Sequence, residues 1–419
     1  MSSRLELLRD LPDWLLRWLW LAVAAVGLVS GTLLREQVAA DPHALGPHTI
    51  SLLGPLVGAT AFLSAACLLD RLTRRAWIAA GGLFFVLCVP FLGLLGSPIV
   101  HWEGDDSFRY STYAHHILAE RTLWGADGLL HGVPYYVDQP GYRYLLAATI
   151  ALLGGEHRGL QLFHMAAMLA GTIGLLAAAS PRGDRPATVG LALFLLGAAP
   201  YAAKNILYGY TEWFTVLLAM LATRSVLKTQ WLAAVVILAL MPFVRQNLLV
   251  VSLVLAVALL VTTRRYWLGL PYLALLGLPL YHNAYYADRW QLLVTNRGSE
   301  VELEAGWFAN IWEVVFEALS KVPHYLGYHP DQDLGTIAIA VMFVPLGTGL
   351  AGWLLSRLES PGRWMLAAVA VAAIGPTLVL GYGSYPRFVY VNLTVTVLSY
   401  WMIRELTGRR NPSPRRPGA

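Results

Sequence analysis

The feature that most constrains the fold is a succession of apolar segments that recurs along nearly the whole chain. A helix needs about 20 predominantly apolar residues to cross a bilayer. Twelve such segments begin near Trp14, Ile50, Ala76, Leu160, Ala187, Thr211, Trp231, Leu248, Tyr266, Thr336, Trp364 and Phe388. The chain has 419 residues, of which 57% are hydrophobic and 13% charged, whereas soluble domains carry about 25% charged residues. The sequence therefore predicts an all-α integral membrane protein with a bundle of about 12 transmembrane helices.

The domain organisation follows from the same segments. Residues 1–404 are predicted to form a single polytopic transmembrane domain, and the Pro/Arg-rich residues 405–419 a disordered cytoplasmic tail. The first segment, 14–34, ends in no small-residue cleavage site, so we interpret it as a retained span. Cys67 and Cys88 both lie inside apolar segments, which argues against a disulfide framework or a cysteine metal cage.

The distribution of charge decides the topology around Pro140–Leu153, an apolar segment of about 14 residues that is short for a crossing. If it does not cross, 18 of the 30 Lys and Arg residues fall on one side in short loops or tails, 11 fall on the other side, and Arg17 lies within the first span. Cytoplasmic loops show this enrichment. We therefore predict that 140–153 is re-entrant or flat at the outer face and that both termini are cytoplasmic.

The outer face is predicted to carry the chemistry. Its large loops, 97–158 and 286–335, would form a cap over the site, and 18 of the 25 acidic residues fall on this face. Within the second loop, apolar residues recur at helical spacing over 306–320, as in a juxtamembrane amphipathic helix or a helix that packs on protein. The basic residues occur in ones to threes between apolar segments, which is a topology signal and no indication of nucleic-acid binding.

An acidic pair, Asp105 and Asp106, follows the third apolar segment directly. Placing two carboxylates at a membrane boundary costs free energy, so a catalytic or ion-binding role explains them most easily. The simpler alternative is N-capping of a helix that begins at Asp106, where the helix dipole favours negative charge. Arg109 lies close enough along such a helix to pair with either carboxylate. His101 could hold a divalent cation together with the two aspartates.

Isolated cations on the same face predict a site for an anion, most naturally a phosphate. Arg143, Arg245 and Arg387 each stand alone against an apolar segment, and Lys204 could join them. Arginine's planar fork suits phosphate, although a single arginine in this setting could equally snorkel to the interface. Glu212, at the start of a span, is either a partner for one of these cations or an acceptor for a sugar hydroxyl.

With these residues in hand, the chain resembles the GT-C superfamily of polytopic glycosyltransferases, which includes protein O-mannosyltransferases, lipid A aminoarabinose transferases and arabinofuranosyltransferases. The resemblance runs from about residue 102 to the last span. It rests on Asp105-Asp106 with Arg109-Tyr110, on residues 139–144 (QPGYRY), on 209–212 (GYTE) and on 385–388 (YPRF). Gln139 stands where the aminoarabinose transferases have a phosphate-binding Lys, so that role would pass to Arg143.

The resemblance implies transfer of a sugar from a polyprenyl-phosphate donor to an acceptor hydroxyl on a glycan, lipid or protein, at the outer face of the plasma (inner) membrane. Asp105, with Asp106 beside it, would act as general base in an inverting displacement. The donor phosphate would bind Arg109, Arg143, Arg245, Arg387 and Lys204. Sugar or acceptor contacts would come from Tyr110, Gln139, Tyr142, Glu212 and His101. No cofactor is assigned; Asp105, Asp106 and His101 would be the ligands if the reaction used a divalent cation.

Two other classes of protein compete with this interpretation. A secondary transporter could use the aspartate pair as its ion or proton site, but transporters place such groups near the midplane, on broken helices within repeats. The sequence has no clear repeat, and the pair lies in a loop. An oligomeric scaffold for lipid carriers would leave the aspartate pair unexplained.

Overall fold

A computed structural model describes residues 105–121, 129–130, 133–134, 140–155, 157–182, 185–207, 209–287, 290, 347, 349–379 and 386–410. These residues are mostly helical, with one short antiparallel contact between β1 (Leu129–Leu130) and β2 (Val133–Pro134). The predicted segments that begin near Trp14, Ile50 and Ala76 lie outside the described residues. So do His101, Gln139, the amphipathic segment 306–320 and much of the segment that begins near Thr336.

Within the described part, eight helices coincide with apolar segments of the sequence. They are α7 (His157–Ala179), α8 (Arg185–Leu207), α9 (Glu212–Leu227), α10 (Trp231–Val244), α11 (Leu249–Thr263), α12 (Gly269–Ala287), α16 (Gly362–Val379) and α17 (Pro386–Arg410). Short 3-10 turns, η3 (Ser180–Arg182), η4 (Gln246–Leu248) and η5 (Tyr266–Leu268), follow α7, α10 and α11. The prediction of an all-helical chain therefore holds for this part.

Two helical stretches of the described residues, Gly159–Ala179 and Gln246–Thr263, are long and apolar enough to cross a membrane by length and composition. The helices Trp231–Val244 and Gly362–Gly375 are also apolar but shorter. A bundle of twelve crossings stays a prediction of the sequence.

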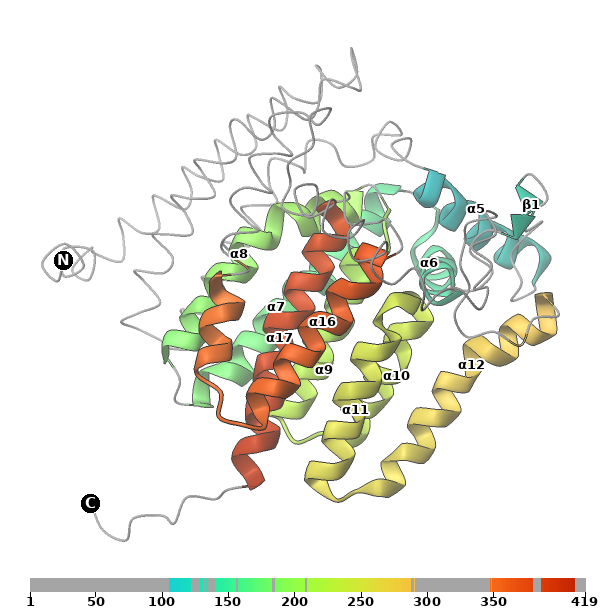
Figure 1. Cartoon of the computed structure of the whole chain (residues 1–419). Helices are drawn as coiled ribbons and strands as arrows, with labels where there is room; N and C mark the ends of the chain where they lie inside the picture. Colours follow the sequence, from blue (N-terminus) through green and yellow to red (C-terminus); the bar gives the residue numbers. More distant parts are fainter. Residues whose placement is uncertain are drawn as a thin grey trace, which may run out of the picture.

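Helix α9 lies at the centre of the bundle and packs against α7, α8, α10 and α17 (Figure 1). Its buried residues point in every direction around its axis, and they include Trp213, Val216 and Met220. A helix that is apolar all round is stable when other helices surround it. This uniform apolarity explains why α9, with its short polar ends, takes the central position.

Helix α17 is longer than the sequence predicted. It continues to Arg410, so residues 405–410 are helical where a disordered tail was expected to begin at 405. Glu405 and Leu406 favour helix, and Leu406 is buried. Pro412 disfavours the helical conformation of the residue before it, which accounts for an end near Arg410.

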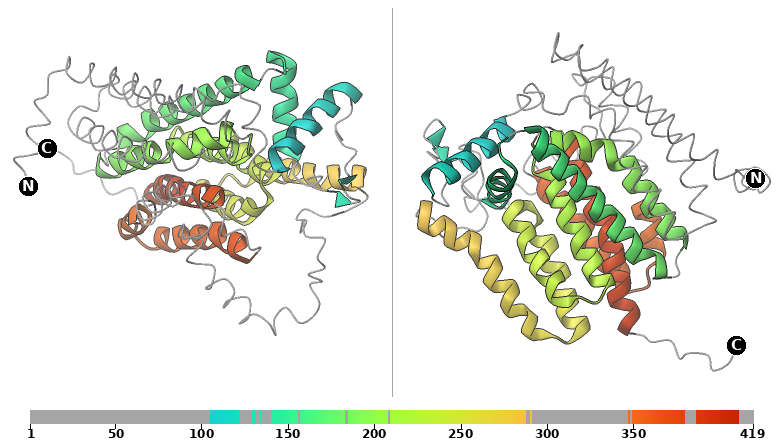
Figure 2. Two further views of the ribbon diagram at one scale, coloured as in Figure 1. Left: turned by 90° about the horizontal axis from the view of Figure 1, so that it is seen from above. Right: turned by 180° about the vertical axis from the view of Figure 1, so that it is seen from behind.

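Helices α5 (Asp105–Glu120) and α6 (Pro140–Leu153) pack against each other at one end of the bundle. Figure 1 shows α6 end-on beside bundle helices seen along their length, and the view from above in Figure 2 agrees, so α6 lies across the end of the bundle. Gly141 permits this crossing, because a Cβ there would lie 2.8 Å from the carbonyl oxygen of Phe243 on α10. The helix has the bounds of the predicted short segment, and its location at the outer face stays a prediction.

The two ends of the bundle differ in charge. The end away from α6 holds the connections α7–α8, α9–α10 and α11–α12 and the last turn of α17 (Figure 1). The basic residues at this end are Arg182, Arg185, Arg224, Lys228, Arg264, Arg265, Arg357, Arg363, Arg404, Arg409 and Arg410. The α6 end carries the starts of α7, α9 and α17 and the end of α10. This is the end where the candidate site residues gather.

Candidate functional site

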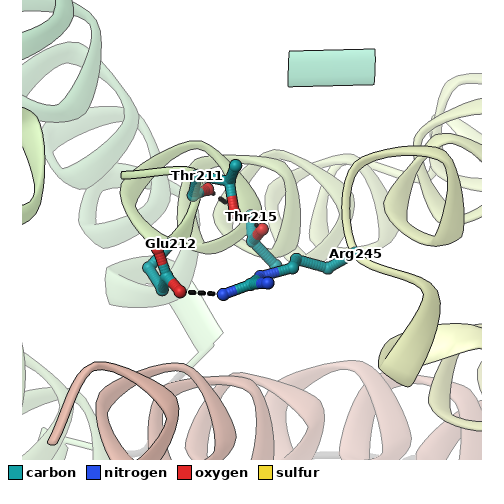
Figure 3. Close-up of polar contacts among 4 residues, drawn as sticks. All are labelled: Thr211, Glu212, Thr215 and Arg245. Atoms are coloured by element: carbon teal, nitrogen blue, oxygen red, sulfur yellow. Dashed lines mark hydrogen bonds and ion pairs between the residues drawn. The ribbon is translucent and has the colours of Figure 1, made fainter. Parts of the chain in front are cut away.

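A buried ion pair between Glu212 and Arg245 lies at the α6 end of the bundle. Glu212 is the first residue of α9, and Arg245 follows the last residue of α10 in an extended conformation. Figure 3 shows the two side chains pointing toward each other across the gap between their helices. Nη2 of Arg245 donates to Oε1 of Glu212, and the guanidinium lies 4.7 Å from the ring centroid of Phe388 on α17.

The sequence explains why the chain breaks at Arg245. An apolar run ends at Val244, and the polar residues Arg245, Gln246 and Asn247 follow. The chain leaves the α-helix there and makes the 3-10 turn η4 before α11 begins. Of the two alternatives for Glu212, the structure shows the cation partner. Because the two charges compensate each other, the pair joins α9 to the α10–α11 connection.

A second arginine, Arg143, is fully buried on α6 and forms the centre of what we call the Arg143 cluster, which also contains Tyr113, Tyr144 and His282. Nη2 of Arg143 donates to Nε2 of His282 on α12 at 3.3 Å. The guanidinium carbon lies 5.4 Å from the ring of Tyr113 on α5 and 5.9 Å from the ring of Tyr144 on α6. Contacts at these distances are cation–π interactions. The cluster therefore ties together α5, α6 and α12.

The phenol of Tyr144 is neutral at physiological pH. Burial raises the pKa of Tyr144 to about 12, and the positive charge of Arg143 opposes this rise without cancelling it. Tyr144 consequently offers Arg143 the negative face of its aromatic ring rather than a phenolate oxygen.

A chain of buried aromatic rings connects the two arginine sites. Tyr110 on α5 meets the ring of Tyr142 on α6 edge-on at 5.2 Å. The indole nitrogen of Trp213, the neighbour of Glu212, donates to the hydroxyl of Tyr142 at 3.1 Å. His164 on α7 stacks on the indole of Trp213 at 4.3 Å. Protein covers the rings of Tyr110 and Tyr142, and the sugar contacts predicted for both residues stay a prediction.

The remaining predicted residues are placed by their backbones. Asp105 and Asp106 form the first turn of α5, one residue earlier than the predicted helix start, and Arg109 follows in the next turn. Lys204 lies in the last turn of α8, and Arg387 in the first turn of α17. All five thus belong to helix ends at the α6 end of the bundle. Among the residues that the structure describes, no group of three His, Cys, Asp or Glu side chains could hold a metal ion.

The sequence prediction missed three residues of this region, namely His282, Trp213 and His164. His282 had a usable signal, because an ionisable residue inside an apolar helix usually faces protein and has a partner. His164 carried the same signal within α7, whereas Trp213 had none, since an aromatic residue in an apolar helix is ordinarily part of the core.

Comparisons of the chain with protein-family models, with curated proteins and with solved structures find no match. The components of the site are an aspartate pair at the start of α5, a buried guanidinium on the helix packed against α5, and a compensated ion pair next to them. A carboxylate can accept a proton, and a guanidinium can bind an anion such as a phosphate.

Proposed function

We propose that this protein is a polytopic membrane glycosyltransferase that moves a sugar from a polyprenyl-phosphate donor to an acceptor hydroxyl at the α6 end of the bundle. The observation that carries the proposal is the packing of α5 against α6. Helix α5 begins with Asp105 and Asp106, and α6 holds the buried guanidinium of Arg143. A general base and a phosphate ligand are thus on contacting helices.

The phosphate contact is assigned to Arg143. Arg245 is a weaker candidate, because Glu212 already compensates its charge. Arg143 presents a planar fork that can hold two phosphate oxygens at once. It has no exposed surface here, so a donor has to displace neighbours to reach it. Helix α12, which supplies His282 and lies at the edge of the bundle (Figure 1), is one of these neighbours.

The reaction is a single displacement. The carboxylate of Asp105 takes the proton of the acceptor hydroxyl while that oxygen forms a bond to the anomeric carbon. The bond from the anomeric carbon to the phosphate oxygen breaks on the opposite side, its electron pair leaves with the phosphate, and the configuration inverts. Arg143 stabilises the charge that develops on the departing phosphate. Phosphate is a good leaving group, so no separate general acid takes part.

The charge of the bundle ends supports an orientation. The basic end, with residues such as Arg264, Arg265 and Arg357, faces the cytoplasm in this proposal, because short cytoplasmic connections are enriched in Lys and Arg. The α6 end then faces outward in the plasma (inner) membrane. A secondary transporter is less well supported, because α5 packs on α6 at one end of the bundle, whereas transporters use broken helices near the midplane.

The proposal is tested by incubating the purified protein with a panel of polyprenyl-phosphate sugars, with and without EDTA, and measuring released polyprenyl phosphate. Asp105→Asn should lower turnover by about 10²–10⁴ while donor binding persists, because the general base is lost. Glu120→Gln is the matched control on the same helix, since Glu120 is exposed at the far end of α5 and should not affect turnover. No release from any donor, or full turnover by Asp105→Asn, would contradict the proposal.

A further inference from the structure

Helices α11 and α12 expose an apolar face to the outside of the bundle. On α11 the exposed residues recur at intervals of three and four, which places them on one face; they are Val250, Leu253, Val257 and Val261, each 45–50% exposed. The opposite face of α11 is buried and includes Leu255. On α12, Leu270 and Leu273 are exposed more strongly still. Contiguous apolar surface of this kind marks contact with a membrane or a protein partner.

Exposed aromatic side chains mark both ends of α12. Tyr266 and Trp267 lie in the turn before the helix, and Tyr281 and Tyr285 lie in its last two turns. From Trp267 to Tyr285 a helical rise of 1.5 Å per residue gives about 27 Å, close to the thickness of a bilayer's hydrocarbon core, about 30 Å. Tyrosine and tryptophan gather at the two membrane–water interfaces in this manner.

We infer that the exposed face of α11 and α12 contacts the acyl chains of a bilayer, with the aromatic residues at the two ends of α12 at its two boundaries. The inference rests on the membrane location in the proposed function. Lipid suits the face better than a protein partner does. Aromatic anchors of protein interfaces gather at the centre of the interface, whereas here they stand at the two ends with aliphatic residues between them. Arg264 and Arg265, just beyond one aromatic end, complement the anionic headgroups of the cytoplasmic leaflet.

This placement fixes the depth of the Arg143 cluster. His282, the hydrogen-bond partner of Arg143, is buried and lies between the exposed Tyr281 and Tyr285. If these tyrosines lie at the interface, the guanidinium of Arg143 lies at the level of the lipid phosphates. A phosphate attached to a lipid would then meet Arg143 without leaving its own layer of the membrane.

The experiment is spin labelling of single cysteines in full-length protein with Cys67→Ser and Cys88→Ser, reconstituted in vesicles of phosphatidylcholine and phosphatidylglycerol. Labels at Val257→Cys and Leu273→Cys should collide several-fold more often with oxygen than with a water-soluble nickel chelate. Tyr285→Cys should give a ratio several-fold lower, as expected at the interface. Leu255→Cys, on the buried face of α11, is the matched control and should be reached poorly by both reagents.

Two outcomes would overturn the inference. Nickel collisions at residues 257 and 273 that equal or exceed oxygen collisions would mean that water covers this face. Collisions with both reagents as rare as at residue 255 would mean that protein, such as a second copy of the chain, covers it. The collision measurement does not depend on sugar transfer, so the two proposals can fail separately. An inactive protein with lipid-facing labels would refute the proposed transferase function alone. An active protein with water-exposed labels would refute the lipid contact alone.

Discussion

Removal of one charge from the Glu212–Arg245 pair should destabilise the protein far more than removal of both. In Glu212→Leu the guanidinium of Arg245 stays in a site where its residue is 8% exposed, and arginine does not lose its proton in proteins. Loss of one member of a buried ion pair costs about 3–5 kcal/mol. The ring of Phe388 still faces the cation, so we expect the lower half of that range.

Removal of the arginine in place of the glutamate should lower the unfolding free energy by less. In Arg245→Met the Glu212 carboxylate is left alone, but a carboxyl group can take up a proton and become neutral, which a guanidinium cannot. In Glu212→Leu/Arg245→Met no charge is left, and replacement of a buried pair by apolar residues is often close to neutral. The double variant should therefore be more stable than Glu212→Leu. Its effect should be smaller than the sum of the two single effects by several kcal/mol, which is the coupling energy between the two positions.

The assay is unfolding in mixed micelles as the fraction of sodium dodecyl sulfate rises, followed by circular dichroism for the wild type, both single variants and the double variant. Glu120→Gln is again the control, because its side chain is 52% exposed and 3.9 Å from His116; it should change the unfolding free energy by about 0.5 kcal/mol or less. The reasoning is refuted if Glu212→Leu costs no more than Glu120→Gln, or if the two single effects add up in the double variant.

Two further predictions concern the packing of α6. Gly141→Ala should lower the unfolding free energy by about 1–3 kcal/mol, because the new methyl group would press on the Phe243 backbone. The control Gly159→Ala, with open space around its Cβ, should be neutral or slightly stabilising. Equal effects of the two variants in the same micelle titration would contradict the close approach of Gly141 to Phe243. Tyr142→Phe should cost about 1–3 kcal/mol, because the indole N–H of Trp213 loses its acceptor in a buried site. An unchanged unfolding midpoint for Tyr142→Phe would mean that this hydrogen bond contributes nothing.

The positions of the helices could be predicted because helix formation depends on short-range patterns. Apolar runs gave the segment at 140–153 and the starts of the eight bundle helices to within a few residues. The end of α17 was missed by six residues, because the basic composition of 405–410 resembled the tail beyond it, while Pro412 gave the better signal. The glycosyltransferase assignment rests on the sequence motifs and stays a prediction, which the donor-panel assay tests.

The sequence by itself determined where most of the described helices lie and which isolated charges lie at helix ends, since helix hydrogen bonds join residues four apart. It did not determine which charges meet. Glu212 and Arg245 are 33 residues apart, and Arg143 and His282 are 139 apart. Such pairs depend on the angle and rotation at which separate helices pack, and those are set by the fit of many side chains at once. Only the tertiary structure therefore decides that Glu212 compensates the charge of Arg245 and that Arg143 contacts His282 on α12.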